Sequence, residues 1–259
     1  MSSAPLAGKT ALVTGGSGGI GTACARALVA DGARVVIMGR RKELLEASRD
    51  RILGEFPDAR VEIAVGDAGQ EDDVRAALQQ AHAMADRLDI VIPTVGGSGF
   101  APFLSTKVED LRRDLDLNIT TAFIAMQLAA PMMTNGGSIV CISSTAATMP
   151  FPALSTYCTA KAGLEGLIRT VADELAALNI RVNAIRPGLT RSNATTDMFA
   201  NPVVIERFLD QTPLKRTGEP EDIAAAVAYL AGPASAWVTG QSFAVDGGQE
   251  LRRNPDLLG

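Results

Sequence analysis

Tyr157 and Lys161 stand four residues apart at the head of a run rich in alanine, leucine and glycine. On a helix this spacing places both side chains on one face. A phenol ordinarily loses its proton near pH ~10, and a neighbouring ammonium stabilises the phenolate. Lowering the phenol pKa from about 10 to about 7 requires roughly 4 kcal/mol, which one close charge in a water-poor cleft can largely supply. The pair therefore predicts a tyrosine that exchanges protons near neutral pH, although the spacing alone also fits an inert surface pair.

A glycine-rich turn near the N-terminus indicates a second kind of chemistry, the binding of phosphate. A strand expected at 9–13 leads into Thr14-Gly15-Gly16-Ser17-Gly18-Gly19-Ile20-Gly21, and a helix is expected at 22–30. Glycines make the turn tight and let backbone N–H groups at the helix N-terminus approach a pyrophosphate. Strand, turn and helix together predict a dinucleotide site, and a merely flexible turn is the alternative.

The residues after the second expected strand, 34–38, bear on which dinucleotide binds. An NAD site usually places an acid there, which accepts a hydrogen bond from the ribose 2'-hydroxyl. This sequence has Gly39, Arg40 and Arg41 instead. With no carboxylate to repel it and guanidinium groups to hold it, a 2'-phosphate is favoured. We predict NADP(H) as the cofactor, and NAD(H) if the arginines merely begin the next helix as solvated charges.

Composition narrows the possible classes of protein. A net charge of -5 gives no basic field for nucleic acid. No apolar run is long enough to cross a bilayer and residues 1–5 lack the pattern of a signal peptide, so we predict a cytoplasmic protein that does not bind membranes. The single histidine, His82, and the three cysteines lack ligand spacing, which predicts no metal site.

Strands and helices are expected to alternate along the whole chain. Apolar strands are expected at 9–13, 34–38, 61–65, 89–92, 138–142, 181–185 and 241–245, and further helices at 71–87, 108–133, 154–178 and 220–231. This order predicts one α/β domain over residues 1–259, a doubly wound Rossmann fold whose parallel sheet of about seven strands has helices on both faces. The irregular segment 189–215 is expected to form a lid over a cleft, and a helical pair packed on the body is the alternative.

In combination these motifs resemble the short-chain dehydrogenase/reductase family in its compact form. The likeness runs from about residue 6 to residue 248. It is carried by Thr14-Gly15-x-x-x-Gly19-x-Gly21, by Ser144 thirteen residues before Tyr157, by Tyr157-x-x-x-Lys161, by Pro187-Gly188 and by Val245-Asp246-Gly247-Gly248. The resemblance implies an oxidoreductase that interconverts a carbonyl and a secondary alcohol with a nicotinamide cofactor.

The resemblance also implies roles for individual residues. Tyr157 would protonate the substrate oxygen as hydride arrives, and Ser144 would hydrogen-bond the same oxygen; Ser143 is its competitor, but the spacing favours Ser144. Lys161 would lower the phenol pKa and hold the nicotinamide ribose, while Asn118 would support a water that relays protons. The implied cofactor residues are Gly15, Ser17, Gly18, Gly19, Ile20, Gly21, Arg40, Arg41, Asp67, Ala68, Gly96, Tyr157, Lys161, Pro187, Gly188, Thr190 and Ser192.

One departure from the family concerns the turn after the fourth expected strand, which reads Pro93-Thr94-Val95-Gly96 where the family usually has Asn-Asn-Ala-Gly. Proline lacks an N–H group, and the missing asparagine is expected to remove hydrogen bonds between neighbouring strands.

The substrate pocket is expected to be apolar, which predicts a small to medium apolar or cyclic, steroid-like carbonyl compound. Its expected lining is Ser144, Ala146, Phe151, Leu154, Tyr157, Leu189, Met198 and Phe199, with Phe100 nearby. Members that reduce acyl-carrier substrates tend to have arginines where this chain has Asn135 and Leu178, so a 3-oxoacyl-thioester reductase is an alternative. A non-catalytic NADP(H)-sensing regulatory protein is another.

The resemblance implies that the helices expected at 108–133 and 154–178 pair across a two-fold axis. Both helices are apolar around much of their circumference, more than one face of a sheet would cover. We therefore predict a homotetramer.

Overall fold

One sheet of seven strands runs through the computed structural model, which describes residues 4–255. Residues 1–3, on which the prediction about a signal peptide partly depends, lie outside this part. The strands are β1 (Thr10–Thr14), β2 (Arg34–Gly39), β3 (Val61–Val65), β4 (Ile90–Pro93), β5 (Gly137–Ile142), β6 (Ile180–Pro187) and β7 (Ser242–Val245). Their order is β3-β2-β1-β4-β5-β6-β7, and each neighbouring pair is parallel. The predicted doubly wound α/β fold is confirmed.

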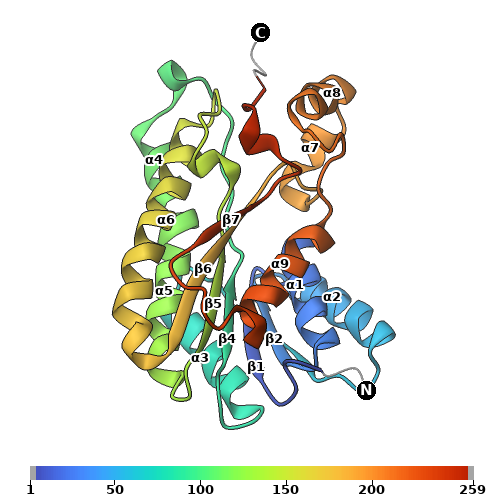
Figure 1. Ribbon diagram of the computed structural model, residues 1–259, viewed down its shortest axis with the longest axis vertical. Coiled ribbons are helices and arrows are strands. Elements are labelled where there is room, and N and C mark those ends of the chain that lie inside the picture. The colour runs from blue at the N-terminus through green and yellow to red at the C-terminus, as the bar shows by residue number, and fades with distance from the viewer. Residues whose placement is uncertain (1–3, 256–259) are drawn as a thin grey trace.

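Helices cover both faces of the sheet (Figure 1). The structure contains α1 (Gly19–Ala30), α2 (Lys42–Glu55), α3 (Glu71–Ala83), α4 (Val108–Leu115), α5 (Thr121–Ala129), α6 (Ser155–Leu175), α7 (Thr196–Phe199), α8 (Pro202–Gln211) and α9 (Pro220–Ala231). Helices α1, α2 and α9 share one apolar core with the sheet, and α3, α5 and α6 share the other. Because both faces are covered, the central strands β1 and β4 are buried along their whole length.

Two long helices are shorter or less regular than predicted. The uninterrupted helix predicted at 108–133 is wrong: α4 ends at Leu115, a π-helical turn spans Asp116–Thr120, and α5 follows. Asn118 Nδ2 donates to the backbone oxygen of Asp114 at 2.8 Å, so a side chain competes for a helical carbonyl and widens the turn. The helix that carries Tyr157 ends at Leu175 and continues only as a 3₁₀ turn.

The strand order reverses between β1 and β4, which opens a crevice beyond the carboxyl ends of the strands. Segment 189–215 lies at this end and forms the two helices α7 and α8, beside the C-terminal segment (Figure 1). Within residues 4–255, no helix combines the length and the apolar character needed to cross a membrane.

Candidate active site

A cleft of about 540 Å³ lies at the carboxyl ends of the strands. Every cofactor residue expected from the sequence lines it, from the glycine turn after β1 to the segment after β6. The sheet brings these residues together because parallel strands all end at the same edge. Their role in binding a cofactor stays a prediction.

The glycine turn fits an anionic ligand. Gly15 has a φ of +68°, and a Cβ there would lie 2.5 Å from Thr94 Oγ1, so a larger residue would not fit. Helix α1 begins at Gly19 with no side-chain cap and no acidic residue in its first turn. Backbone N–H groups at such a helix end favour a phosphate. The turn can therefore hold the pyrophosphate of a dinucleotide.

Two arginines line the far end of the cleft, where β2 ends at Gly39. The Arg40 side chain is 77% exposed, and its Nη1 lies 3.9 Å from a carboxylate oxygen of Asp67. Arg41 is exposed and precedes α2. This end of the cleft therefore presents two guanidinium groups, one of them already near an acid.

Tyr157, Lys161 and Ser144 meet on the other side of the glycine turn. Lys161 Nζ lies 5.6 Å from the centre of the Tyr157 ring and donates to the Ile142 oxygen at 2.8 Å. The Ser144 hydroxyl lies beside the Tyr157 hydroxyl and, through a side-chain hydrogen bond, lowers the pKa of the phenol. The Ser143 hydroxyl points elsewhere and donates to Glu165 at 2.7 Å. The structure therefore places Ser144, and not Ser143, beside Tyr157.

Burial has the largest effect on the pKa values of Tyr157 and Lys161. It raises the pKa of Tyr157 to about 12, against the hydrogen bond with Ser144, which lowers it. Burial likewise lowers the pKa of Lys161 to about 8. The expected lowering of the phenol pKa by Lys161 is not observed, because both groups lose water. A phenol that keeps its proton at neutral pH can act as an acid toward a carbonyl oxygen.

Asn118 lies behind the cleft and is not part of its lining among the described residues. Its carboxamide accepts from Gly97 N at 3.1 Å and donates to Gly97 O at 2.8 Å, so it holds the loop after β4. A Cβ at Gly96 would lie 2.7 Å from Asn118 Oδ1 and 2.9 Å from Lys161 Nζ. The absence of a side chain at Gly96 lets these two polar groups approach the same small space.

The unusual turn after β4 keeps a link between the central strands. Pro93 pairs with Thr14 as the last residue of β4. Thr94 then donates to the Thr14 oxygen twice, from its backbone N at 3.3 Å and from its hydroxyl at 2.6 Å. On the β1 side the threonine hydroxyl therefore supplies a hydrogen bond between neighbouring strands, while the pairing of β4 with β5 ends at Val91.

The apolar end of the cleft contains most of the expected substrate residues. Ser144, Phe151, Leu154, Tyr157, Leu189 and Met198 line it. Three expectations are corrected. Ala146 is buried in the turn that Ser144 caps. The Phe199 ring lies 4.2 Å beneath the Arg191 guanidinium, and Phe100 is 47% exposed.

Other lining residues come from parts of the chain that the motifs do not mark. The Phe208 ring on α8 packs edge-on against Phe151 with 5.8 Å between ring centres. Gln249 and Asn254, from the C-terminal segment, also line the cleft, and Gln249 Nε2 donates to Asn254 Oδ1 at 2.7 Å. Asn254 in turn donates to the Pro150 oxygen at 3.3 Å. In the sequence, only the glycine-rich segment 245–248 indicates a turn that could bring these C-terminal residues to the cleft.

Comparison with known proteins places the chain in a family. A family model described as "Enoyl-(Acyl carrier protein) reductase" matches residues 15–250. A solved short-chain type dehydrogenase/reductase from Mycobacterium ulcerans superposes with a TM-score of 0.93 at 36% identity, covering 97% of this chain and 93% of that one. The chain belongs to the short-chain dehydrogenase/reductase family. Membership agrees with the resemblance noted in the sequence.

Curated relatives within the short-chain dehydrogenase/reductase family differ in substrate. A 3alpha-hydroxysteroid dehydrogenase from Mediterraneibacter gnavus is 35% identical over 93% of this chain and 97% of its own length. A 3-oxoacyl-[acyl-carrier-protein] reductase from Synechocystis is 35% identical over 95% of this chain and 98% of its own. A 7 alpha-hydroxysteroid dehydrogenase solved with NADH and 7-oxo glycochenodeoxycholic acid matches with a TM-score of 0.90 at 32% identity, and the match covers 97% of both chains.

Membership in the short-chain dehydrogenase/reductase family establishes the general activity. The protein is an oxidoreductase that acts on CH-OH and C=O groups of small molecules with a nicotinamide cofactor. Across the described part of the chain, no group of three or more His, Cys, Asp or Glu side chains is arranged to hold a metal ion.

Proposed function

We propose that the protein is an NADP(H)-dependent oxidoreductase that interconverts a ketone or aldehyde and a secondary alcohol. The observation that carries this proposal is that the Tyr157 and Ser144 hydroxyls lie together beside Lys161. They line the same cleft as the glycine turn, where helix α1 begins without a side-chain cap. A bound nicotinamide supplies or accepts the hydride.

The side chains supply the proton and hold the reacting oxygen. Because the hydroxyls of Tyr157 and Ser144 lie side by side, a carbonyl oxygen placed between them can accept a hydrogen bond from each. Tyr157 then gives its proton to the developing alkoxide, and takes one back in the oxidative direction. The Asn118 oxygen and Lys161 Nζ both border Gly96, an arrangement suited to a water that returns the proton to Tyr157 through Lys161.

The proposed activity is tested by mixing purified protein with NADPH and a panel of cyclic and linear ketones, and following the loss of NADPH absorbance. Calorimetry measures NADPH binding in parallel. Oxidation of NADPH by at least one ketone supports the proposal. Binding without turnover by any carbonyl would favour the alternative of an NADP(H)-sensing regulator, and neither binding nor turnover would overturn both.

We expect NADPH preference to depend on Arg40 and Arg41. Replacing both by alanine should weaken NADPH binding by about 10- to 100-fold, since charge-assisted hydrogen bonds to a phosphate contribute about 1.5–3 kcal/mol. NADH binding should change little, because NADH lacks the 2'-phosphate. Calorimetry with each dinucleotide measures the effect, and Arg51→Ala, an exposed charge elsewhere on α2, is the control. An equal loss for both dinucleotides would contradict NADP(H) specificity.

The substrate is proposed to be a small to medium apolar carbonyl, including cyclic and steroid-like compounds. The edge-on pair Phe151 and Phe208 forms an apolar wall, and segment 189–215 is proposed to close over the substrate as a lid. Among relatives, both hydroxysteroid dehydrogenases support this class, and the Synechocystis 3-oxoacyl-carrier reductase supports the alternative of a 3-oxoacyl thioester. Comparing kcat/KM for a ketosteroid and for acetoacetyl-CoA separates the two.

Assembly into a homotetramer is proposed from apolar side chains that stay exposed on the chain. Phe123 on α5 is 41% exposed, and Trp237 before β7 is fully exposed. Paired copies would cover such surfaces. Light scattering should give four times the 27.0 kDa mass of the chain, and a mass of one chain would contradict the proposal. A cytoplasmic location stays a prediction from the sequence.

A further inference from the structure

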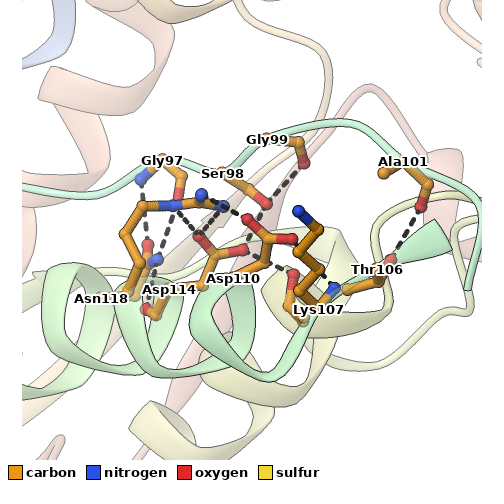
Figure 2. A network of polar contacts seen from close by, with 11 residues as sticks. Gly97, Ser98, Gly99, Ala101, Thr106, Lys107, Asp110, Asp114 and Asn118 are labelled. Carbon is orange, nitrogen blue, oxygen red and sulfur yellow. Dashed lines mark hydrogen bonds and ion pairs between the residues drawn. The ribbon is translucent and has the colours of Figure 1, made fainter.

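A buried carboxylate lies one helical turn before Asn118. Asp114, on the last turn of α4, is 0% exposed. Its Oδ2 accepts from the Ser98 hydroxyl and from the Thr156 hydroxyl, each at 2.6 Å. Its Oδ1 accepts from the Arg113 guanidinium at 3.1 and 3.2 Å. Figure 2 shows Asp114 and Asn118 side by side beneath the loop of Gly97, Ser98 and Gly99. Asp114 has no part in the reaction proposed above.

Three hydrogen bonds to Asp114 hold three different segments around the cleft. Ser98 belongs to the loop after β4 and lines the cleft. Thr156 is the residue before Tyr157 and lies in the first turn of α6. The backbone oxygen of Asp114 accepts from Asn118 at 2.8 Å, within the π-helical turn. One residue therefore holds the cleft loop, the Asn118 turn and the start of the helix that carries Tyr157.

We propose that Asp114 is a positioning residue, which fixes Tyr157 through Thr156 and fixes the cleft loop through Ser98. The proposal rests on the function proposed above and adds a residue to its machinery. Severing this tie should disturb turnover without touching the dinucleotide end of the cleft, since Asp114 does not line the cleft with the glycine turn or with Arg40 and Arg41.

Asp114 also places a negative charge near the phenol. Ser144 after β5, Cys158 on the same helix and Asp114 on α4, itself paired with Arg113, affect the pKa of Tyr157, and Lys161 lies over its ring. Among these, the Asp114 carboxylate raises the pKa of Tyr157, since it disfavours a second negative charge. Removing the charge while keeping the shape should therefore lower that pKa and make the phenolate appear at lower pH.

The chain allows this effect to be read without any substrate. It has two tyrosines, so in a Tyr229→Phe background the tyrosinate absorbance reports Tyr157 alone. At about pH 10.5, between the ordinary phenol pKa and the raised one, Asp114→Asn should raise the tyrosinate fraction above that of the parent. Asp116→Asn is the matched control, because it removes the same charge from the exposed side of the same helical segment. Equal fractions in all three proteins would overturn the electrostatic part of the inference.

The hydrogen bond from Thr156 to Asp114 is tested separately with Thr156→Val, which keeps the side-chain shape and the Asp114 charge but removes the hydroxyl. In an active parent, we expect a fall in kcat of about tenfold or more, unchanged NADPH affinity by calorimetry and no rise in tyrosinate. A kcat equal to that of the parent would overturn the positioning role. Circular dichroism shows whether each variant is folded, and the tyrosinate measurement stands even if the parent turns over no ketone.

Discussion

Tyr157→Phe is expected to lower kcat by about 10²–10⁴-fold while NADPH affinity changes by less than about twofold. The substitution removes one hydroxyl, the group that bonds to Ser144 and would give its proton to the substrate oxygen. The ring that packs beneath Lys161 Nζ remains, so the cleft keeps its shape. Steady-state kinetics with the best ketone of the panel measures kcat, and calorimetry measures the affinity for NADPH.

Tyr229→Phe serves as the control for this prediction, because Tyr229 is 47% exposed on α9 and does not line the cleft. If Tyr157→Phe turned over the ketone within about threefold of the parent rate, the proton would have to come from another group. A large loss of NADPH affinity in the same variant would instead indicate that the phenol acts in binding.

Lys161→Met is expected to abolish most activity and, at neutral pH, to preserve or raise the melting temperature. Loss of activity follows because the variant lacks the ammonium that lies beside Tyr157 and the space at Gly96. The expected melting temperature of the variant follows from the burial of Lys161, which lowers the pKa of the ammonium from 10.5 to about 8. By linkage this corresponds to a cost of about 3 kcal/mol for keeping the ammonium buried. The lost hydrogen bond to the Ile142 oxygen offsets part of the gain.

The sign of the pH dependence distinguishes this account from a general effect of the substitution. Between pH 8 and 10.5 the unfolded chain holds the lysine proton more tightly than the folded chain, so the parent gains stability from this group as pH rises. The difference in unfolding free energy between Lys161→Met and the parent should therefore shrink across that range. Chemical denaturation at several pH values measures it, and a difference independent of pH would contradict a buried ammonium.

The residues that could be predicted from the sequence are those whose position follows from local spacing. Tyr157 and Lys161 share a helix face because they stand four residues apart, and Gly15 lies at the edge of the sheet because a strand ends there. Asp114 and Phe208 could not be found this way. Their place in the site depends on a π-helical turn and on α8 packing against Phe151, contacts between segments far apart in the chain.

The direction in which the pKa of Tyr157 shifts could also be determined only from the structure. From the sequence, the neighbouring ammonium is the dominant influence, whereas in the fold the loss of water outweighs it. Spacing tells which charges are close, but the number of protein atoms that surround a group depends on tertiary packing. Asn118 is buried, and Gly97 on the facing loop supplies the hydrogen-bond partners that a buried amide needs.

The C-terminal segment has a practical consequence for recombinant work. Gln249 and Asn254 form part of the cleft wall, and Asn254 ties the segment to Pro150, close to Phe151. Strand β1 begins at the opposite edge of the sheet from the cleft (Figure 1). An affinity tag or immobilisation linker joined at the carboxyl side would pull on a wall of the cleft, so purification handles and surface attachment belong at the amino side.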